Sequence, residues 1–209
     1  MYGILFDLDG TLLDTLEDLA DSVNYALTQY GYPTHTLDEI RSFVGNGAAM
    51  LAKLSTPEGE DYEPVLRTFQ THYKAHCQVK TGPYAGVLDA LTQIRAEYPV
   101  AVVSNKPDPA VKALCDDYFD GVFALGERSD CPRKPAPDML YKAMEQLGVD
   151  KAIYIGDSEV DVITAKNAGM PCISVLWGFR TEEEIRQHGG SIFCSDPKQL
   201  PEIVRSLAK

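Results

Sequence analysis

Apolar positions along the chain fall into two kinds of pattern, short continuous runs and stripes with helical spacing. The first run, Tyr2–Leu8, is interrupted by Asp7 and ends at Asp9-Gly10-Thr11, so it predicts a buried strand closed by a turn. From Leu16 to Tyr30 the apolar residues follow the helical period, and Gly31 with Pro33 ends that pattern. The chain therefore begins with a strand followed by a helix.

A second helical region comes next. Thr36 and Glu39 have the spacing of a capping box and predict the start of a helix, which Gly45-Asn46-Gly47 interrupts. Leu66, Phe69 and Tyr73 mark one further helix before Gly82-Pro83. No strand pattern occurs in this region, so we interpret residues 15–81 as a helical insertion behind the first strand.

The rest of the chain alternates between strands and helices, and its strands are almost continuously apolar. Such alternation predicts a parallel sheet with helices on both faces. The expected fold is α/β, a Rossmann-like three-layer core formed by residues 1–14 and 82–209 with an inserted α-helical cap, 15–81. The expected strands are Val100–Val103, Val122–Leu125, Ala152–Ile155 and Cys172–Leu176, and the expected helices are Val87–Glu97, Pro109–Cys115, Pro137–Leu147, Glu159–Ala168 and Leu200–Leu207.

Charge narrows the range of partners. The 209 residues include 19 basic and 31 acidic ones, a net charge of −12, which argues against a nucleic-acid or anionic-membrane surface. No apolar run approaches the ~20 residues of a membrane span. The five cysteines are odd in number and form no Cys-x-x-Cys pair, so we expect a cytoplasmic protein. A monomer and a homodimer both remain open.

Acidic residues stand where predicted strands end. Asp7 and Asp9 follow the first strand, and Asp157 follows a later one. Ligands of open α/β sheets bind at the carboxyl ends of the strands, and convergent carboxylates there suit a hard cation, Mg²⁺ rather than Ca²⁺. Taken alone, two of these segments could serve the fold only, because Asp9-Gly10 is a common turn sequence and Asp157-Ser158 a common start of a helix.

At these residues the sequence resembles the haloacid dehalogenase-like superfamily of aspartyl-phosphate hydrolases. Phe6-Asp-Leu-Asp-Gly-Thr11 is similar to the first motif of the family and Val103-Ser-Asn105 to the second. Lys134-Pro135 is similar to the third and Gly156-Asp-Ser-Glu-Val-Asp161 to the fourth. The resemblance covers essentially the whole chain and implies a phosphatase with a helical cap.

The resemblance also implies a role for each site residue. Asp7 is the expected nucleophile and Asp9 the expected acid and base, while Asp7, the backbone carbonyl of Asp9 and Asp157 are the expected ligands of Mg²⁺. Lys134 balances the charge, and Ser104 holds a phosphate oxygen. Further expected contributors are the phosphate-loop residues Gly10, Thr11 and Asn105 and the supporting residues Ser158 and Asp161, of which Asp161 is expected to orient Lys134 or a metal-bound water.

A narrower resemblance points to the substrate. Ser104-Asn-Lys-Pro107 is similar to a segment of the phosphoglycolate phosphatases, and so are Arg41 with Val44-Gly-Asn-Gly47 and the Trp177-Gly178 pair. A departure is Ala136, where many members carry His. The expected substrate is 2-phosphoglycolate, a small-molecule phosphate ester, with Arg41, Gly45, Asn46, Gly47 and Lys106 as candidate ligands of its carboxylate.

Other functions stay open at this stage. A sugar-phosphate phosphatase or a β-phosphoglucomutase-like enzyme would use the same Asp7 chemistry, and a catalytically silent module that binds a phosphometabolite is a remote alternative. A dehalogenase or a phosphonate hydrolase is disfavoured because those relatives carry a different residue at the position of Asp9. His72 and His76 are four residues apart without an acidic third ligand, which disfavours a zinc site.

Overall fold

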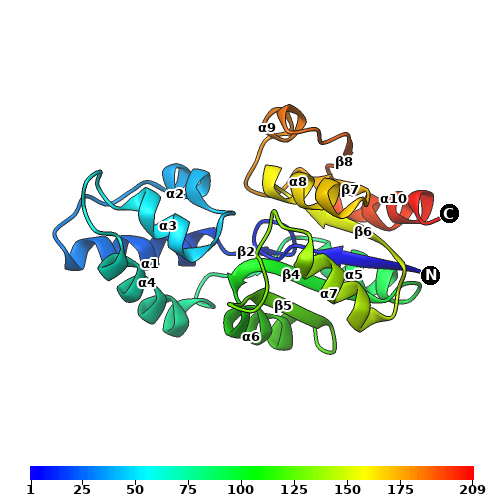
Figure 1. Cartoon of the computed structure of the whole chain (residues 1–209), viewed down its shortest axis with the longest axis horizontal. Helices are drawn as coiled ribbons and strands as arrows, with labels where there is room; N and C mark the ends of the chain where they lie inside the picture. The colour runs from blue at the N-terminus through cyan, green and yellow to red at the C-terminus, as the bar shows by residue number, and fades with distance from the viewer.

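The computed structural model describes residues 1–209 and contains one six-stranded parallel sheet. The strands run in the order β5-β4-β1-β6-β7-β8, with β1 paired to β4 on one side and to β6 on the other (Figure 1). The first strand of the chain is therefore central. The strands are β1 (Tyr2–Phe6), β4 (Val100–Pro107), β5 (Phe123–Glu127), β6 (Lys151–Gly156), β7 (Cys172–Val175) and β8 (Ile192–Cys194).

Helices cover both faces of this sheet, because side chains alternate between the faces along each strand. Ile4 and Phe6 pack into one buried cluster, while Leu5 between them packs into another on the opposite face. The first cluster includes residues of α5 (Val87–Arg95), α6 (Asp108–Tyr118) and α10 (Leu200–Leu207); the second includes residues of α7 (Asp138–Leu147) and α8 (Glu159–Ala168). The predicted α/β fold class is confirmed. No helix combines the length and apolarity needed to cross a membrane.

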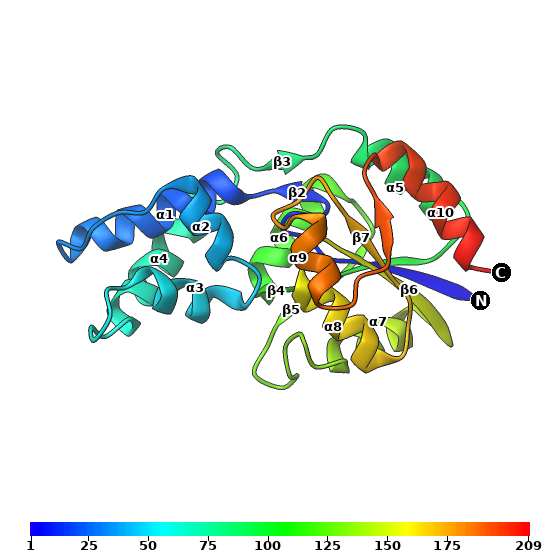
Figure 2. The ribbon, with the colours of Figure 1, turned by 90° about the horizontal axis from the view of Figure 1, so that it is seen from above.

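Four helices lie beside the sheet and pack on one another (Figure 2). They are α1 (Leu16–Gln29), α2 (Leu37–Phe43), α3 (Gly47–Ser55) and α4 (Glu63–His76). We keep the predicted boundaries and call residues 15–81 the cap and the remainder the core. The chain passes between the core and the cap twice. At these two connections β2 (Leu13–Asp14) pairs antiparallel with β3 (Gly82–Pro83). Helix α3 is not expected from the sequence, because it begins at Gly47, a residue whose type is typical of a helix break.

One loop of the core reaches into the cap. The segment 176–181 follows β7 and precedes α9 (Glu182–Gln187). Phe179 of this loop is buried in the hydrophobic cluster of the cap helices. The Arg180 guanidinium donates to the backbone carbonyls of Arg41 (2.8 Å), Ser42 (3.3 Å) and Val44 (2.7 Å), at the end of α2. The same guanidinium pairs with Glu159 of the core at 3.1 Å, so Arg180 holds cap and core together.

Replacing Arg180 tests this connection. We expect Arg180→Met to lower the free energy of unfolding by about 2–4 kcal/mol, because it leaves Glu159 and the terminal carbonyls of α2 without their donor. Urea denaturation followed by circular dichroism measures the change. Arg67→Met, which removes an exposed ion pair with Glu63 on α4, is the control and should change the free energy by less than about 0.5 kcal/mol. Equal effects of the two substitutions would contradict the role of Arg180.

Candidate active site

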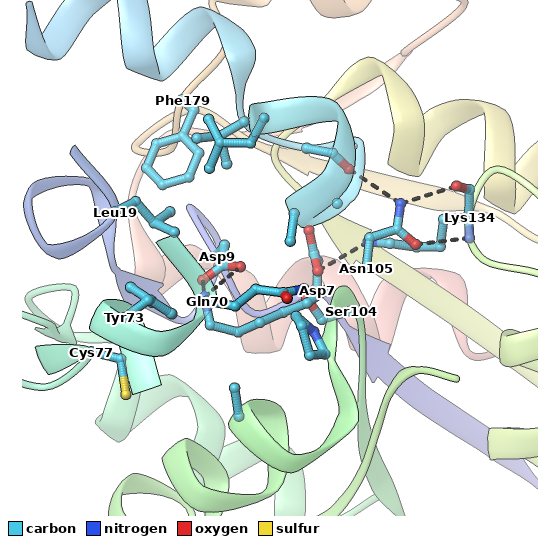
Figure 3. A pocket seen from close by; sticks show the side chains of 18 of the residues that line it. Asp7, Asp9, Leu19, Gln70, Tyr73, Cys77, Ser104, Asn105, Lys134 and Phe179 are labelled. Carbon is cyan, nitrogen blue, oxygen red and sulfur yellow. Dashed lines mark hydrogen bonds and ion pairs between the residues drawn. The ribbon is translucent and has the colours of Figure 1, made fainter. Parts of the chain in front are cut away.

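A cavity of about 430 Å³ lies between the cap and the carboxyl edge of the sheet (Figure 3). The strand ends and the cap helices both line this cavity. Its position at the carboxyl ends of the strands is the usual one for a ligand site in an open α/β sheet. From the core, the sequence-predicted residues that line it are Asp7, Asp9, Ser104, Asn105, Lys106, Lys134, Asp157 and Ser158; from the cap they are Gly45 and Gly47.

The acidic residues meet because their strands are neighbours. Asp7 directly follows β1 and Asp157 directly follows β6, and these two strands pair in parallel. Together with Asp161, in the first turn of α8, they place carboxylate oxygens within 4.8 Å of one another, and all three residues are buried. Three buried carboxylates at this separation repel one another unless cations lie between them.

One cation is Lys134, which precedes α7 and is 2 % exposed. Its ammonium is 2.9 Å from Asp7 Oδ1 and 2.8 Å from Asp161 Oδ1, and it donates to the Tyr154 hydroxyl at 2.8 Å. Burial disfavours the charge on this lysine, but Asp161 and Asp7 outweigh it and raise its pKa above the usual range. Lys134 therefore stays charged and fixes Asp7 in place.

The single lysine does not balance this group of acids. Burial raises the pKa of Asp7 to about 7; the positive charge of Lys134 opposes the shift and the negative charge of Asp161 adds to it. Burial also raises the pKa of Asp157 well above its usual range, and repulsion from Asp161 and Asp7 adds to that effect. Protein groups alone thus do not compensate the ionised forms of Asp7 and Asp157 at the ends of β1 and β6.

The donor set of this cluster fits a hard divalent cation. Each oxygen of Asp161 accepts from two donors: Oδ1 from Lys134 and Tyr154, and Oδ2 from the backbone N–H and the hydroxyl of Ser158. Each oxygen of Asp157 accepts from only one donor, so Asp7 and Asp157 keep lone pairs for an ion, a sparse all-oxygen set typical of Mg²⁺ sites. Gly10 packs against the Asp157 carboxylate at a φ of +80°, where a Cβ atom would collide with it.

Asp9 has different neighbours from Asp7. Its carboxylate accepts hydrogen bonds from Lys106 Nζ at 2.8 and 3.1 Å and from the Thr15 hydroxyl at 2.7 Å. The Lys106 ammonium also lies over the ring of Tyr73 from α4, 4.6 Å from its centroid. Two carboxylates two residues apart are thus paired with two different buried lysines, which allows them to act differently.

Asn105 connects this site to the cap. Its side-chain amide donates to the carbonyls of Lys134 (3.0 Å) and Gly45 (3.2 Å), and its oxygen accepts from the Lys134 backbone N–H at 2.8 Å. The side chain of Asn105 is therefore occupied by protein groups. Asn105 thus positions the Lys134 backbone and connects it to the cap, and its expected contact with substrate stays a prediction.

Several predicted ligands do not line the cavity themselves. Arg41 pairs with Asp38 on its own helix and faces a separate surface depression that includes Asp14. Thr11 is turned toward Asp157, whose Oδ1 accepts from its hydroxyl at 3.2 Å. Neither these two residues nor Gly10 and Asn46 line the cavity. Arg41 lies elsewhere because its helix α2 ends before the chain turns at Gly45 toward the core.

Two contributors to the site were not anticipated. Tyr154, inside β6, bridges Lys134 and Asp161, and the Phe179 backbone N–H donates to Asp157 Oδ2 at 2.7 Å. In the sequence Tyr154 is one more apolar strand residue, and a backbone donor leaves no signal in residue types. The Trp177-Gly178 pair marked this loop, but the pair did not reveal what the loop contacts.

The raised pKa of Asp7 predicts a pH-dependent stability of the metal-free protein. A folded-state pKa above the unfolded value means that this group favours folding most below about pH 4, and that this contribution is lost as the pH rises through about 7. In EDTA, Asp7→Asn should therefore be more stable than the wild type at pH 8, by about 1 kcal/mol or more, and nearly equal to it at pH 4. Urea denaturation at both pH values measures this, and a pH-independent difference would contradict it.

Comparisons with known proteins agree with this geometry. The family model described as haloacid dehalogenase-like hydrolase matches residues 4–175. A phosphoglycolate phosphatase of Rhodobacter capsulatus is 39 % identical over 85 % of both chains, and one of Cereibacter sphaeroides strain ATCC 17025 is 33 % identical over 99 % of both. A solved structure from Lactobacillus delbrueckii subsp. bulgaricus, provisionally named a phosphoglycolate phosphatase, is 38 % identical with a TM-score of 0.91 over 97 % of both chains. The chain therefore belongs to the haloacid dehalogenase-like hydrolase family.

Proposed function

We propose that this hydrolase is a magnesium-dependent phosphatase that cleaves 2-phosphoglycolate through an aspartyl-phosphate intermediate. The observation that carries the proposal is the pair Asp7 and Asp9 at one end of one cavity, each with its own buried lysine. One carboxylate is held by Lys134 beside the acidic cluster, and the other is held by Lys106 on the side of the cap. This separation suits a nucleophile and a proton carrier.

The first half-reaction transfers the phosphoryl group to Asp7. A carboxylate oxygen of Asp7 forms a bond to phosphorus as the ester P–O bond breaks, and Asp9 gives a proton to the departing alcohol oxygen. Lys134, 2.9 Å from Asp7, and Ser104 of the adjacent strand β4 stabilise the phosphoryl oxygens. The site thus distributes the transition-state charge over fixed donors.

The second half-reaction releases phosphate. Asp9 takes a proton from a water molecule, the water oxygen bonds to phosphorus, and the bond to the Asp7 oxygen breaks. The Thr15 hydroxyl and the Lys106 ammonium hold the Asp9 carboxylate beside the leaving-group position once it has given its proton to the alcohol, ready to take one from the water. Asp7 and Asp9 return to their starting states.

Asp7, Asp157 and the backbone carbonyl of Asp9 would hold Mg²⁺. When bound, the ion supplies the positive charge that the acidic cluster lacks. It also reduces the repulsion between the Asp7 carboxylate and the anionic phosphate of the substrate. Thr11 and Phe179 hold Asp157 in this arrangement through its two oxygens.

Two observations support 2-phosphoglycolate as the substrate. Relatives that match 85–99 % of the chain are named for this activity. Lys106 is a buried cation in contact with Asp9, so a carboxylate close to the leaving oxygen would lie beside its ammonium. The walls of the cavity beyond this point are mostly apolar, which disfavours the sugar-phosphate alternatives because sugar hydroxyls need polar partners.

Replacing the nucleophile tests the covalent route. We expect Asp7→Asn to reduce phosphate release from 2-phosphoglycolate at least about a thousandfold, because an amide does not form the acyl phosphate. Measured phosphate release gives the rate, and circular dichroism checks that the variant is folded. A folded variant with more than a tenth of the wild-type rate would remove Asp7 from the proposed role.

Metal and substrate are tested together with a panel of phosphate esters. The wild-type protein, supplied with Mg²⁺, should release phosphate from 2-phosphoglycolate, and excess EDTA should lower the rate at least about a hundredfold. Restoring Mg²⁺ should restore the activity. A rate that does not respond to EDTA would contradict the metal site, whereas turnover of sugar phosphates without turnover of 2-phosphoglycolate would contradict the substrate.

A further inference from the structure

Tyr73 of the cap helix α4 lines the cavity on the same side as Asp9 (Figure 3). The residue is 6 % exposed, and its ring is stacked with that of Phe69, 5.5 Å away between centroids. The Lys106 ammonium lies 4.6 Å from the centroid of the Tyr73 ring, but no protein group is hydrogen-bonded to the buried hydroxyl. A buried hydroxyl without a partner costs free energy, so in a cavity wall it indicates a partner that is not part of the protein.

Tyr73 differs from the other polar residues that α4 contributes to the cavity. Gln70 and Lys74 are exposed, and Cys77 is half-buried one turn further along the helix. Burial raises the pKa of the Tyr73 hydroxyl above its usual range, so the hydroxyl keeps its proton and can donate it to a hydrogen bond. The cavity wall therefore contains a fixed donor that no protein group uses.

The charges near Tyr73 favour an anionic partner for this donor. Lys134 and Arg180, which also line the cavity, are paired with acidic residues of the core. Lys106 is the buried cation on the Tyr73 side, and its own partner is Asp9. When Asp9 acts as the proposed acid it carries a proton instead of a charge, so the Lys106 ammonium is then available to a second anion.

The position of Tyr73 indicates which part of the substrate this anion is. In the proposed reaction the phosphoryl group is transferred to Asp7, which is paired with Lys134, whereas the leaving oxygen lies at Asp9. The carboxylate of 2-phosphoglycolate is attached to the carbon that bears this leaving oxygen. A carboxylate has two oxygens, so it can accept from a hydroxyl and from an ammonium at the same time.

We infer that Tyr73 is a specificity-determining residue that donates a hydrogen bond to the carboxylate of 2-phosphoglycolate, beside the positive charge of Lys106. This inference rests on the proposed function and assigns the residue of the cap that recognises its substrate. It gives to α4 the role that the sequence analysis expected of Arg41 on α2. The Tyr73 ring holds Lys106 and the hydroxyl binds the substrate, so substitutions can separate the two contributions.

Removal of the hydroxyl alone tests this assignment. Tyr73→Phe keeps the ring beside Lys106 and takes away no hydrogen bond within the protein. With Mg²⁺, its kcat/KM for 2-phosphoglycolate should fall about tenfold to a hundredfold, mainly through KM, because the lost hydrogen bond is made to a charged group. Its kcat/KM for ethyl phosphate, which has a methyl group in place of the carboxylate, should be almost unchanged.

Two unreactive analogues give the same comparison without turnover. In 3-phosphonopropionate a methylene group replaces the leaving oxygen of 2-phosphoglycolate, and propylphosphonate has in addition a methyl group in place of the carboxylate. Calorimetry with Mg²⁺ should show that the wild type binds 3-phosphonopropionate at least about tenfold more tightly than propylphosphonate, and that Tyr73→Phe loses most of this preference. A wild type without the preference, or a Tyr73→Phe variant that keeps it, would overturn the inference.

Two further variants make the test specific. Tyr62→Phe removes a hydroxyl at the start of α4, outside the cavity, and should keep the wild-type preference. Tyr73→Met removes the hydroxyl together with the ring, so it should lose the preference and also lower kcat for ethyl phosphate, because the ring no longer holds Lys106. Circular dichroism shows whether each variant is folded. If Tyr73→Phe does not fold, a folded Tyr73→Met variant that retains the preference for the carboxylate contradicts the inference.

The measurements separate this inference from the proposed function. If the wild type prefers 3-phosphonopropionate through Tyr73 but hydrolyses no ester, the recognition of the carboxylate is retained and the phosphatase function fails. If the wild type hydrolyses 2-phosphoglycolate but Tyr73→Phe affects both esters equally, the phosphatase function is retained and the inference fails.

Discussion

The structure depends on the balance between buried acids and buried lysines at the carboxyl edge of the sheet. Asp7, Asp157 and Asp161 converge there because β1 and β6 are adjacent, and α8 begins directly behind β6. Lys134 compensates part of this charge and Tyr154 fixes its position. The ionised forms of Asp7 and Asp157 remain uncompensated by protein groups, and a cation bound there would supply the missing charge.

The loop 176–181 joins this electrostatic arrangement to the position of the cap. Within four residues it contacts the first motif through Trp177, Asp157 through the Phe179 backbone, the cap cluster through the Phe179 ring and helix α2 through Arg180. Gly178 packs so closely against Gly10 and Asp157 that a side chain would not fit. A displacement of the cap is thus mechanically connected with Asp157, one of the two carboxylates proposed to hold the ion.

The cavity combines two kinds of recognition that require different surroundings. Charge at the strand ends is buried and rigidly paired, and in the proposed reaction it would be the same for every ester. The cap helices and α6 line the rest of the cavity, so any selection among alcohols would depend on them. The sheet therefore positions the acids and lysines, while the surfaces that would contact the alcohol lie outside it.

The amino-acid sequence by itself determined the α/β class, nearly all strands and helices of the core, and the convergence of Asp7, Asp9 and Asp157. These follow from local periodicity and from the rule that parallel strands end at one edge, so they need no knowledge of distant contacts, whereas Lys134 was expected beside them from the resemblance to the family. The tertiary structure decided which lysine pairs with which acid, the placement of Arg41 outside the cavity, and the roles of Tyr154 and Arg180. Those outcomes depend on residues far apart in the chain and on backbone donors and acceptors, whose positions are set only when cap and core pack together.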